Sequence, residues 1–397
     1  MARPGVGLGP IMRVTPTHLA DGRELFYFDD SEPFASGQAT RRLDDPRPLS
    51  PPDHQSAPEM RLDPLAGEWI AMASDRMERT FMPAAKSCPL CPAQPGAAYQ
   101  DGEIPDADYD VVVFENRFPA FARPADQAID AGWSLDDDPI WPVRPAAGRC
   151  EVICFSPDHD ASLSTLPPSR VRTVIDAWAV RTEALQRLNG IAQVFPFENH
   201  GREIGVTLPH PHGQIYAFPY LPPKTAALVR QAQAYSLRTG GHLLNDLTRA
   251  EVQSGRRLVA QTGHWIAYVP AAARWPVEVI LAPRQDRLDL PALNPSERDD
   301  LSHLLPWLFG GLNHYFAGAK GQPIDMPYIA AWHQAPLAPE LRALGRLQLQ
   351  LFSTRRAPDK LKHLAGSESA MGAWLADTVP ERIAERLRAV LAPLDHV

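Results

Sequence analysis

The same succession of elements is expected twice along this chain of 397 residues. Short apolar runs predict two strands, an apolar repeat of three to four residues then predicts a helix, and two more strands follow. In the first half these elements are expected at residues 109–114, 150–155, 169–189, 192–197 and 205–208. In the second half they are expected at residues 265–269, 277–281, 296–317, 328–332 and 347–352. Because the chain is long for one core, the pattern predicts a duplicated α+β unit with antiparallel sheets and packed helices.

Three segments are expected along the chain. Residues 1–58 are rich in Pro, Arg and Asp and lack a lasting period, so we expect an extended, irregular N-terminal extension in which residues 23–28 can pair as a short strand. Residues 59–222 and 223–397 are expected to form the two repeated halves. A closing helix is expected at residues 380–391, because a proline stands near its first turn.

Composition narrows the class of protein. The net charge of −8 disfavours a nucleic-acid-binding surface, and 44% hydrophobic with 22% charged residues is ordinary for a globular protein. No apolar run approaches the roughly 18–20 residues of a membrane helix, and the N-terminus lacks an apolar signal core. Four cysteines do not make a disulfide scaffold. We therefore expect a cytoplasmic enzyme without nucleic-acid or membrane partners.

The run Pro-His-Pro-His-Gly-Gln at residues 209–214 indicates a catalytic or ligand-binding site. If the segment is extended, a period of two places His210, His212 and Gln214 on one face. Two imidazoles and a carboxamide side by side are costly to bury, and they suit either a metal site or a nucleophile with a polar helper. Gly213 is expected to leave room for a ligand phosphate near the backbone.

Several separate motifs together resemble the galactose-1-phosphate uridylyltransferase family, a branch of the histidine-triad superfamily. They are Asp-Pro-Leu-x-Gly-Glu-Trp-Ile at 63–70, Cys-x-x-Cys at 88–91, Val-Ile-Cys-Phe-Ser-Pro-Asp-His at 152–159, Glu-Asn at 198–199 before the histidine run, Trp-Pro-Val-Glu at 275–278, and Trp-His at 332–333. The resemblance implies two histidine-triad-like halves. The first would carry the nucleophile and a zinc site, and the second would supply hexose recognition and dimer contacts.

The resemblance implies a ping-pong exchange of UMP between UDP-glucose and galactose 1-phosphate, with His212 as the nucleophile that forms a uridylyl-histidine intermediate. The chemistry of the residues agrees, because a neutral imidazole is a competent nucleophile near neutral pH. The Gln214 carboxamide can donate to a phosphoryl oxygen in the transition state but cannot readily activate water. Glutamine at this position therefore favours a transferase over a hydrolase.

The resemblance also implies a structural zinc ion. Its four ligands would come from three separate segments, and the site would fix the strand that carries the nucleophile: Cys88, Cys91, His159 and His210. The other two cysteines, Cys150 and Cys154, share one face of a strand and are expected to be buried as small apolar residues.

Substrate contacts are assigned by the same resemblance. Arg76 and Arg79 are expected to bind phosphate oxygens in bidentate fashion. The nucleotide is expected to be approached by four small or amide-bearing residues: Asn116, Asn199, Gly205 and Thr207. Lys362 and Glu368 are expected to meet the hexose phosphate and the sugar hydroxyls from the partner subunit, which implies a homodimer.

The chain departs from the family pattern at a second metal site that some members carry. His333 is present, but the other three ligand positions hold Leu228, Gln348 and Gln350. Amides are poor ligands for transition metals, so no iron is expected here and His333 is expected to be a structural hydrogen-bonding residue. The family glutamine that helps to recognise the hexose falls near Trp374, which leaves the sugar specificity open.

Two alternative functions share some or all of these motifs. One is a related nucleotidyltransferase or phosphorylase that acts on ADP-glucose or another nucleotide sugar through the same His212. The other is a non-catalytic relative that binds nucleotide as a sensor. Covalent transfer of a nucleotide to the protein distinguishes the two catalytic functions from the non-catalytic one.

Overall fold

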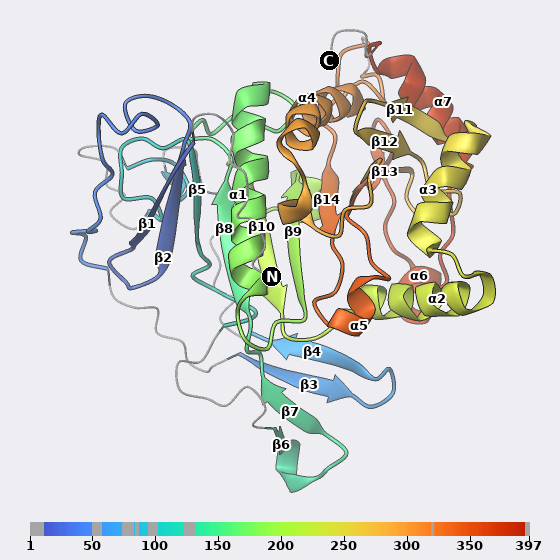
Figure 1. The fold of residues 1–397 in the computed structure, drawn as a ribbon, viewed down its shortest axis with the longest axis horizontal. Coiled ribbons are helices and arrows are strands. Elements are labelled where there is room, and N and C mark those ends of the chain that lie inside the picture. The colour runs from blue at the N-terminus through green and yellow to red at the C-terminus, as the bar shows by residue number, and fades with distance from the viewer. Residues whose placement is uncertain are drawn as a thin grey trace.

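An antiparallel sheet of eleven strands forms the centre of the molecule (Figure 1). The computed structural model describes residues 12–49, 58–73, 83, 87–93, 102–122, 132–318 and 321–393. In spatial order the strands of this sheet are β1 (Arg13–His18), β2 (Glu24–Asp29), β5 (Val111–Glu115), β8 (Arg149–Cys154), β10 (His212–Phe218), β9 (Gln193–His200), β14 (Tyr328–His333), β15 (Gln348–Ser353), β13 (Val277–Pro283), β12 (Trp265–Tyr268) and β11 (Leu258–Gln261).

Two further sheets are small. A four-stranded sheet lies below the central sheet in Figure 1. Its strands, in spatial order, are β4 (Glu68–Met72), β3 (Glu59–Asp63), β7 (Pro142–Pro145) and β6 (Trp133–Ser134). A two-stranded sheet pairs β16 (Arg355–Ala357) with β17 (Lys360–Leu361). The helices are α1 (Pro168–Gln186), α2 (Pro223–Thr239), α3 (Leu243–Ser254), α4 (Pro295–Leu312), α5 (Pro339–Arg342), α6 (Gly366–Met371) and α7 (Pro380–Val390), with short 3-10 turns η3 (Leu135–Asp137), η4 (Arg202–Ile204) and η5 (Leu290–Ala292).

The two halves of the chain repeat one topology, which confirms the predicted duplicated α+β unit. In the first half two strands, helix α1 and two more strands give the spatial order β5-β8-β10-β9. In the second half the same succession around α4 gives β12-β13-β15-β14. The innermost strands β9 and β14 pair antiparallel, with Glu198 opposite Ala330. This pairing joins the halves into one continuous sheet.

Helices α1 and α4 lie side by side on one face of the sheet (Figure 1). Each begins at a proline in its first turn, and α4 has a complete capping box between Asn294 and Glu297. The apolar stripe of α1 is buried against the sheet, where the Trp178 ring meets Trp332 of the other half at 6.1 Å between ring centroids. A buried ion pair of 2.8 Å between Asp176 and Arg298 also links the two helices.

The N-terminal region adds a hairpin to the edge of the central sheet. The strand expected at residues 23–28 is present as β2, which pairs with β5 and with the unanticipated β1. The limits of the three segments, 1–58, 59–222 and 223–397, remain a prediction. No described helix is long and apolar enough to cross a membrane.

The prediction of a strand at residues 205–208 is wrong. These residues form an irregular loop after η4, and Gly205 has a φ of 84°, in the left-handed region that glycine adopts without strain. Pairing with β8 begins only at His212, because Pro209 and Pro211 have no N–H to donate to a ladder. Helices α2 and α3 were not anticipated either, since few of their residues are buried.

Candidate active site

Strand β10 presents alternate residues to opposite faces of the sheet. Gly213, Ile215 and Ala217 are buried, whereas His212, Gln214 and Tyr216 are partly exposed on the other face. His210 does not share this face, because it precedes the strand and its ring is 1% exposed. The prediction that the three side chains share one face of a strand is therefore right for His212 and Gln214 and wrong for His210.

A backbone hydrogen bond fixes the tautomer of the His212 imidazole. Its Nδ1 lies 2.8 Å from the carbonyl oxygen of His210, which can only accept, so Nδ1 carries the proton. Burial lowers the pKa of His212, against the opposing effect of this hydrogen bond. The neutral ring therefore keeps a free lone pair on Nε2, which is the form of histidine that acts as a nucleophile.

The orientation of the Gln214 carboxamide is also set by a neighbour. The Tyr216 hydroxyl donates to Gln214 Oε1 at 3.2 Å, which leaves the amide NH₂ as the donor available to a ligand. The Tyr216 ring packs edge-on against Phe197 at 5.1 Å between ring centroids. Sequence reasoning missed Tyr216, although it continues the same two-residue alternation beyond Gln214.

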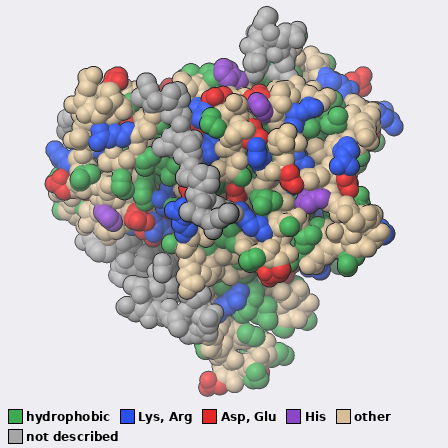
Figure 2. Space-filling view, in the orientation of Figure 1, with side chains coloured by type: hydrophobic (Ala, Val, Ile, Leu, Met, Phe, Trp, Pro, Cys, Tyr) green, Lys and Arg blue, Asp and Glu red, His purple; other side chains and the backbone are tan. Residues whose placement is uncertain are grey.

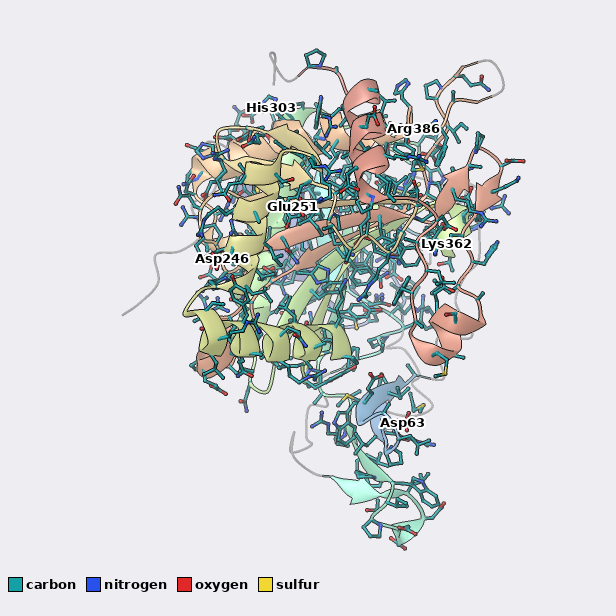
Figure 3. The ribbon with its side chains drawn as sticks, turned by 90° about the vertical axis from the view of Figure 1, so that its right-hand side faces the viewer. Asp63, Asp246, Glu251, His303, Lys362 and Arg386 are labelled. Carbon is teal, nitrogen blue, oxygen red and sulfur yellow. The ribbon has the colours of Figure 1, made fainter. Side chains whose placement is uncertain are left out.

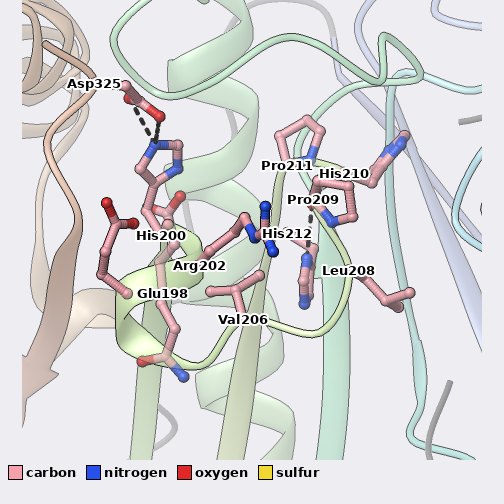
Figure 4. Close-up of a pocket in the computed structure, with 13 residues that line it drawn as sticks. Glu198, His200, Arg202, Val206, Leu208, Pro209, His210, Pro211, His212 and Asp325 are labelled. Atoms are coloured by element: carbon pink, nitrogen blue, oxygen red, sulfur yellow. Dashed lines mark hydrogen bonds and ion pairs between the residues drawn. The ribbon is translucent and has the colours of Figure 1, made fainter. Parts of the chain in front are cut away.

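A pocket of about 280 Å³ opens beside His212 (Figure 4). It is formed where the end of β9, the loop before β10 and the segment before β14 meet. Its lining residues are Glu198, Asn199, His200, Gly201, Arg202, Glu203, Val206, Leu208, Pro209, His210, Pro211, His212 and Asp325. Of the residues predicted to bind the nucleotide, Asn199 lines this pocket, whereas Gly205 and Thr207 lie in the adjoining loop but do not line it.

The acidic groups of the pocket were not found from the sequence. His200 Nε2 pairs with the Asp325 carboxylate at 2.9 Å. Burial lowers the pKa of His200, but the nearby carboxylates of Asp325 and Glu198 outweigh this effect, so the pKa is raised. Glu198 is 2% exposed and accepts from the Tyr328 hydroxyl at 3.1 Å. Burial raises the pKa of Glu198 to about 7, against the lowering effects of His200 and of that hydroxyl.

A group that can hold a metal ion lies directly behind His212. The ligand atoms of four residues are all within 4.8 Å of one another: Cys88, Cys91, His159 and His210. The Cys91 Sγ lies 3.4 Å from His159 Nδ1 and 3.5 Å from His210 Nδ1. Ligands of a tetrahedral zinc ion would be separated by about 3.6 Å, from the usual metal–sulfur and metal–nitrogen distances. The donor set and its spacing therefore fit such an ion.

Backbone and side-chain partners orient the buried ligand His210. Its Nε2 donates to the Ser156 carbonyl oxygen at 2.9 Å and lies 2.8 Å from the Tyr109 hydroxyl. Nδ1 is therefore turned toward Cys91, as expected when the second ring nitrogen of a metal-binding histidine is hydrogen-bonded. Tyr109 was not predicted, because no local pattern places it near residues about 50 and 100 positions away.

Of the other predicted site residues that the structure describes, Asn116, Lys362 and Glu368 do not line the His212 pocket. The Asn116 side chain accepts from the Phe118 N–H at 2.9 Å, and the Asn116 backbone N–H donates to the Cys150 carbonyl oxygen. On β8, Cys150 lies four residues from Cys154, the residue that pairs with His212. That offset corresponds to about 13 Å along the strand. Cys150 and Cys154 are both buried, as expected. Arg76 and Arg79 lie outside the described residues.

Lys362 and Glu368 form their own ion pair, with 3.3 Å between Nζ and Oε1. Figure 1 places α6, which carries Glu368, at the outer side of the second half, well away from β10. Figure 3 likewise shows Lys362 on the second half, apart from Asp63 of the small sheet. Within one chain these two residues are therefore separate from the His212 pocket.

A hydrogen-bonded network occupies the place of the second metal site. His333 Nε2 lies 3.1 Å from Gln350 Oε1, which also accepts from the Lys224 ammonium. The amide nitrogen of Gln350 donates to Glu278 at 2.6 Å. The side chains of His333 and Gln350 are thus bonded within the protein, and the predicted structural role of His333 agrees with these contacts.

Gly213 serves packing rather than phosphate access, contrary to expectation. A Cβ at this position would lie 2.8 Å from the Phe197 carbonyl oxygen and 3.0 Å from the Phe155 ring. The space beside Gly213 is on the buried face of β10 and is already filled.

Comparison with known families covers most of the chain. The family described as galactose-1-phosphate uridyl transferase, N-terminal domain, matches residues 47–222, and its C-terminal domain matches residues 228–395. A galactose-1-phosphate uridylyltransferase of Streptomyces lividans is 39% identical over 96% of this chain and 98% of its own length. The enzyme of that name from Rattus norvegicus is 33% identical over 85% of this chain and 88% of its own length.

Solved structures with a similar fold cover most of this chain. A structure described as uridylyltransferase superposes with a TM-score of 0.70 at 33% identity, covering 84% of this chain and 98% of the other. An ADP-glucose phosphorylase from Arabidopsis thaliana with bound ADP-glucose shares the fold, with a TM-score of 0.63 at 22% identity over 85% of this chain and all of the other.

Proposed function

This chain belongs to the galactose-1-phosphate uridylyltransferase family, and we propose that it transfers UMP between UDP-glucose and galactose 1-phosphate. The observation that carries the proposal is the His212 imidazole beside a pocket: a backbone carbonyl holds the ring proton on Nδ1, and no described residue bonds to Nε2. The Gln214 amide on the same strand face offers a donor next to it. An attacking nitrogen and a phosphoryl-oxygen donor are what such a transfer requires.

The reaction follows from these groups in two steps. His212 Nε2 attacks the α-phosphorus of UDP-glucose; a P–N bond forms, the bond from phosphorus to the bridging oxygen breaks, and glucose 1-phosphate leaves. The cationic uridylyl-imidazole is stabilised by the Nδ1–H bond to the His210 carbonyl oxygen. A phosphate oxygen of galactose 1-phosphate then attacks the same phosphorus and releases His212. The Gln214 NH₂ stabilises the non-bridging oxygens in both transition states.

The metal-binding group is proposed to hold a structural zinc ion. Two thiolates and two imidazoles form a ligand set typical of zinc, and a closed set of four leaves no position for substrate. The ion would supply no chemistry to the transfer. Its ligand His210 lies two residues before His212 and accepts the hydrogen bond that fixes the nucleophile, so the site would hold the catalytic ring in place.

A homodimer is proposed to complete the active site. Lys362 and Glu368, which the family pattern assigns to the hexose phosphate and hydroxyls, are remote from His212 within one chain. A second subunit could bring them to the pocket without rearranging either half. On the face in Figure 2, Lys and Arg side chains are interspersed with Asp and Glu side chains. With a net charge of −8, no nucleic-acid partner is proposed, and a cytoplasmic location is proposed.

The decisive experiment is the detection of the covalent intermediate. The protein is incubated with UDP-glucose or with ADP-glucose and its intact mass is measured without acid. We expect one UMP to be added from UDP-glucose to the wild type and to the control His303→Ala, which alters an exposed histidine of α4, and no adduct on His212→Ala.

Each other outcome points elsewhere. An AMP adduct from ADP-glucose in place of UMP would move the protein to the adenylyl-transferring relatives. An adduct that persists in His212→Ala would refute the assigned nucleophile. No adduct from either donor would favour the non-catalytic, nucleotide-binding reading.

A further inference from the structure

One described residue that lines the His212 pocket, Arg202, carries a permanent positive charge and has no role in the proposed transfer so far. Among the thirteen lining residues, Arg202 is the sole Lys or Arg. It belongs to η4, the short turn that follows β9, and its side chain is exposed. Figure 4 shows the Arg202 side chain extending across the pocket toward the His212 ring.

The acidic side chains of the pocket do not neutralise this guanidinium, because they are engaged elsewhere. Glu203 pairs with Arg355 at 2.6 Å, and Asp325 pairs with His200 at 2.9 Å. Glu198 is buried and accepts from Tyr328. Among the described residues, none forms an ion pair with Arg202. The pocket beside His212 therefore has a cation that no described residue neutralises.

We propose that Arg202 binds phosphoryl oxygens of the nucleotide diphosphate while His212 attacks the α-phosphorus. The proposal rests on the proposed uridylyl transfer and adds a phosphate-binding residue to it. A guanidinium matches two phosphate oxygens in bidentate fashion, which makes arginine a common phosphate-binding residue. An arginine that reaches toward the attacked phosphorus can stabilise both the bound diphosphate and the charge that builds on it during transfer.

The proposal predicts a loss that depends on phosphate. Binding of uridine, UMP and UDP is measured by titration calorimetry for the wild type, Arg202→Gln, Arg202→Lys and the control Arg230→Gln. The control removes the same charge from an exposed position of α2. We expect Arg202→Gln to bind UDP about ten- to a hundredfold more weakly, as for the loss of a charge-assisted hydrogen bond, with uridine affinity unchanged. Arg202→Lys should recover part of the affinity, and Arg230→Gln should equal the wild type.

The result separates this proposal from the function on which it rests. If the wild type binds UDP and forms the UMP adduct but Arg202→Gln binds UDP equally well, the role of Arg202 is refuted and the transfer chemistry stands. An equal loss of uridine and UDP affinity in Arg202→Gln would also overturn it, because the residue would then shape the pocket rather than bind phosphate. A wild type that binds no UDP and forms no UMP adduct would reject both.

Discussion

At the scale of single residues, the proposed catalytic pair, His212 and Gln214, depends on hydrogen bonds that hold each group in one of its possible forms. The His210 carbonyl oxygen selects the tautomer of His212, and the Tyr216 hydroxyl selects the orientation of Gln214. An amide that can rotate by half a turn would present its oxygen to the phosphoryl group half of the time and repel it. The hydroxyl of Tyr216 is therefore expected to act through Gln214 without touching the substrate.

Tyr216→Phe tests this positioning role. Removing the hydroxyl should lower kcat by about three- to tenfold, the effect of one neutral hydrogen bond, with little change in KM. Steady-state kinetics of the exchange measure both constants. Tyr220→Phe is the matched control, because it removes a hydroxyl from the same aromatic cluster without a contact to Gln214. Equal kcat values for Tyr216→Phe and the wild type would exclude the role.

Glu198 gives the stability of the fold a pH dependence. Its pKa of about 7 in the folded state exceeds the ordinary value of 4.5, so folding favours the protonated form. Below pH 4.5 Glu198 is protonated in both the folded and the unfolded state, so it does not change the free energy of unfolding. Above pH 7 Glu198 is ionised in both states, and its ionisation then lowers the free energy of unfolding by about 3 kcal/mol. Glu198→Gln removes this ionisation while keeping an acceptor for Tyr328.

We therefore expect Glu198→Gln to be more stable than the wild type above pH 7 and nearly equal to it near pH 4.5. Urea unfolding at a series of pH values measures the difference. The exposed Glu340→Gln serves as the control and should show no such trend. A constant difference across this range would mean that folding does not raise the pKa of Glu198.

At the scale of elements, the metal-binding group ties three loops to the edge of β10. Cys88 and Cys91 come from a turn before β5, His159 follows β8, and His210 precedes β10. None of these segments is held there by a strand pairing of its own. A metal ion that joins them would therefore stabilise the loop that carries the backbone carbonyl bonded to His212.

Cys88→Ser should lower the zinc content and the melting temperature, the latter by several degrees, while the remaining folded protein still forms the UMP adduct. Metal analysis and thermal unfolding, with and without a chelator, test this. Cys150→Ser removes a buried thiol outside the group and should retain the metal. Full zinc occupancy in Cys88→Ser would show that the ligand has been assigned wrongly.

At the scale of the whole molecule, one sheet runs through both halves, yet Lys362 and Glu368, which are proposed to recognise the hexose, do not line the pocket of the proposed nucleophile His212. The β9–β14 pairing and the Asp176–Arg298 ion pair make the two halves one body, so a hinge between them cannot close Lys362 onto His212. A second subunit is the simpler source of Lys362 for the active site.

A hybrid dimer tests the shared site. Subunits with His212→Ala and with Lys362→Gln, each inactive alone, are co-expressed with different tags and the hybrid is purified. If Lys362 acts across the interface, the hybrid has one complete site of two and should show about half of the wild-type activity. A hybrid of wild-type and His212→Ala subunits gives the reference. An inactive hybrid of the two variants would place both residues in the same subunit's site.

Local patterns in the sequence were enough to predict much of the fold. Helices α1, α4 and α7 were predicted, and so were eight strands of the central sheet: β2, β5, β8, β9, β12, β13, β14 and β15. An apolar period over several residues reports which side of a segment is buried. Helices α2 and α3 bury few residues and gave no comparable signal. The loop at 205–208 was misassigned because glycine and proline, rather than its apolar residues, determine its path.

The sequence by itself identified the proposed nucleophile His212, its neighbour Gln214 and the four side chains that could hold a metal ion, because these lie in short motifs whose residue types have few other uses. Only the tertiary structure decided which groups surround them. Tyr109, Asp325 and Arg202 reach the site through loops and strand ends, from positions that carry no local pattern. Burial and hydrogen bonding between distant segments set their roles, and these are properties of the packed molecule rather than of any stretch of chain.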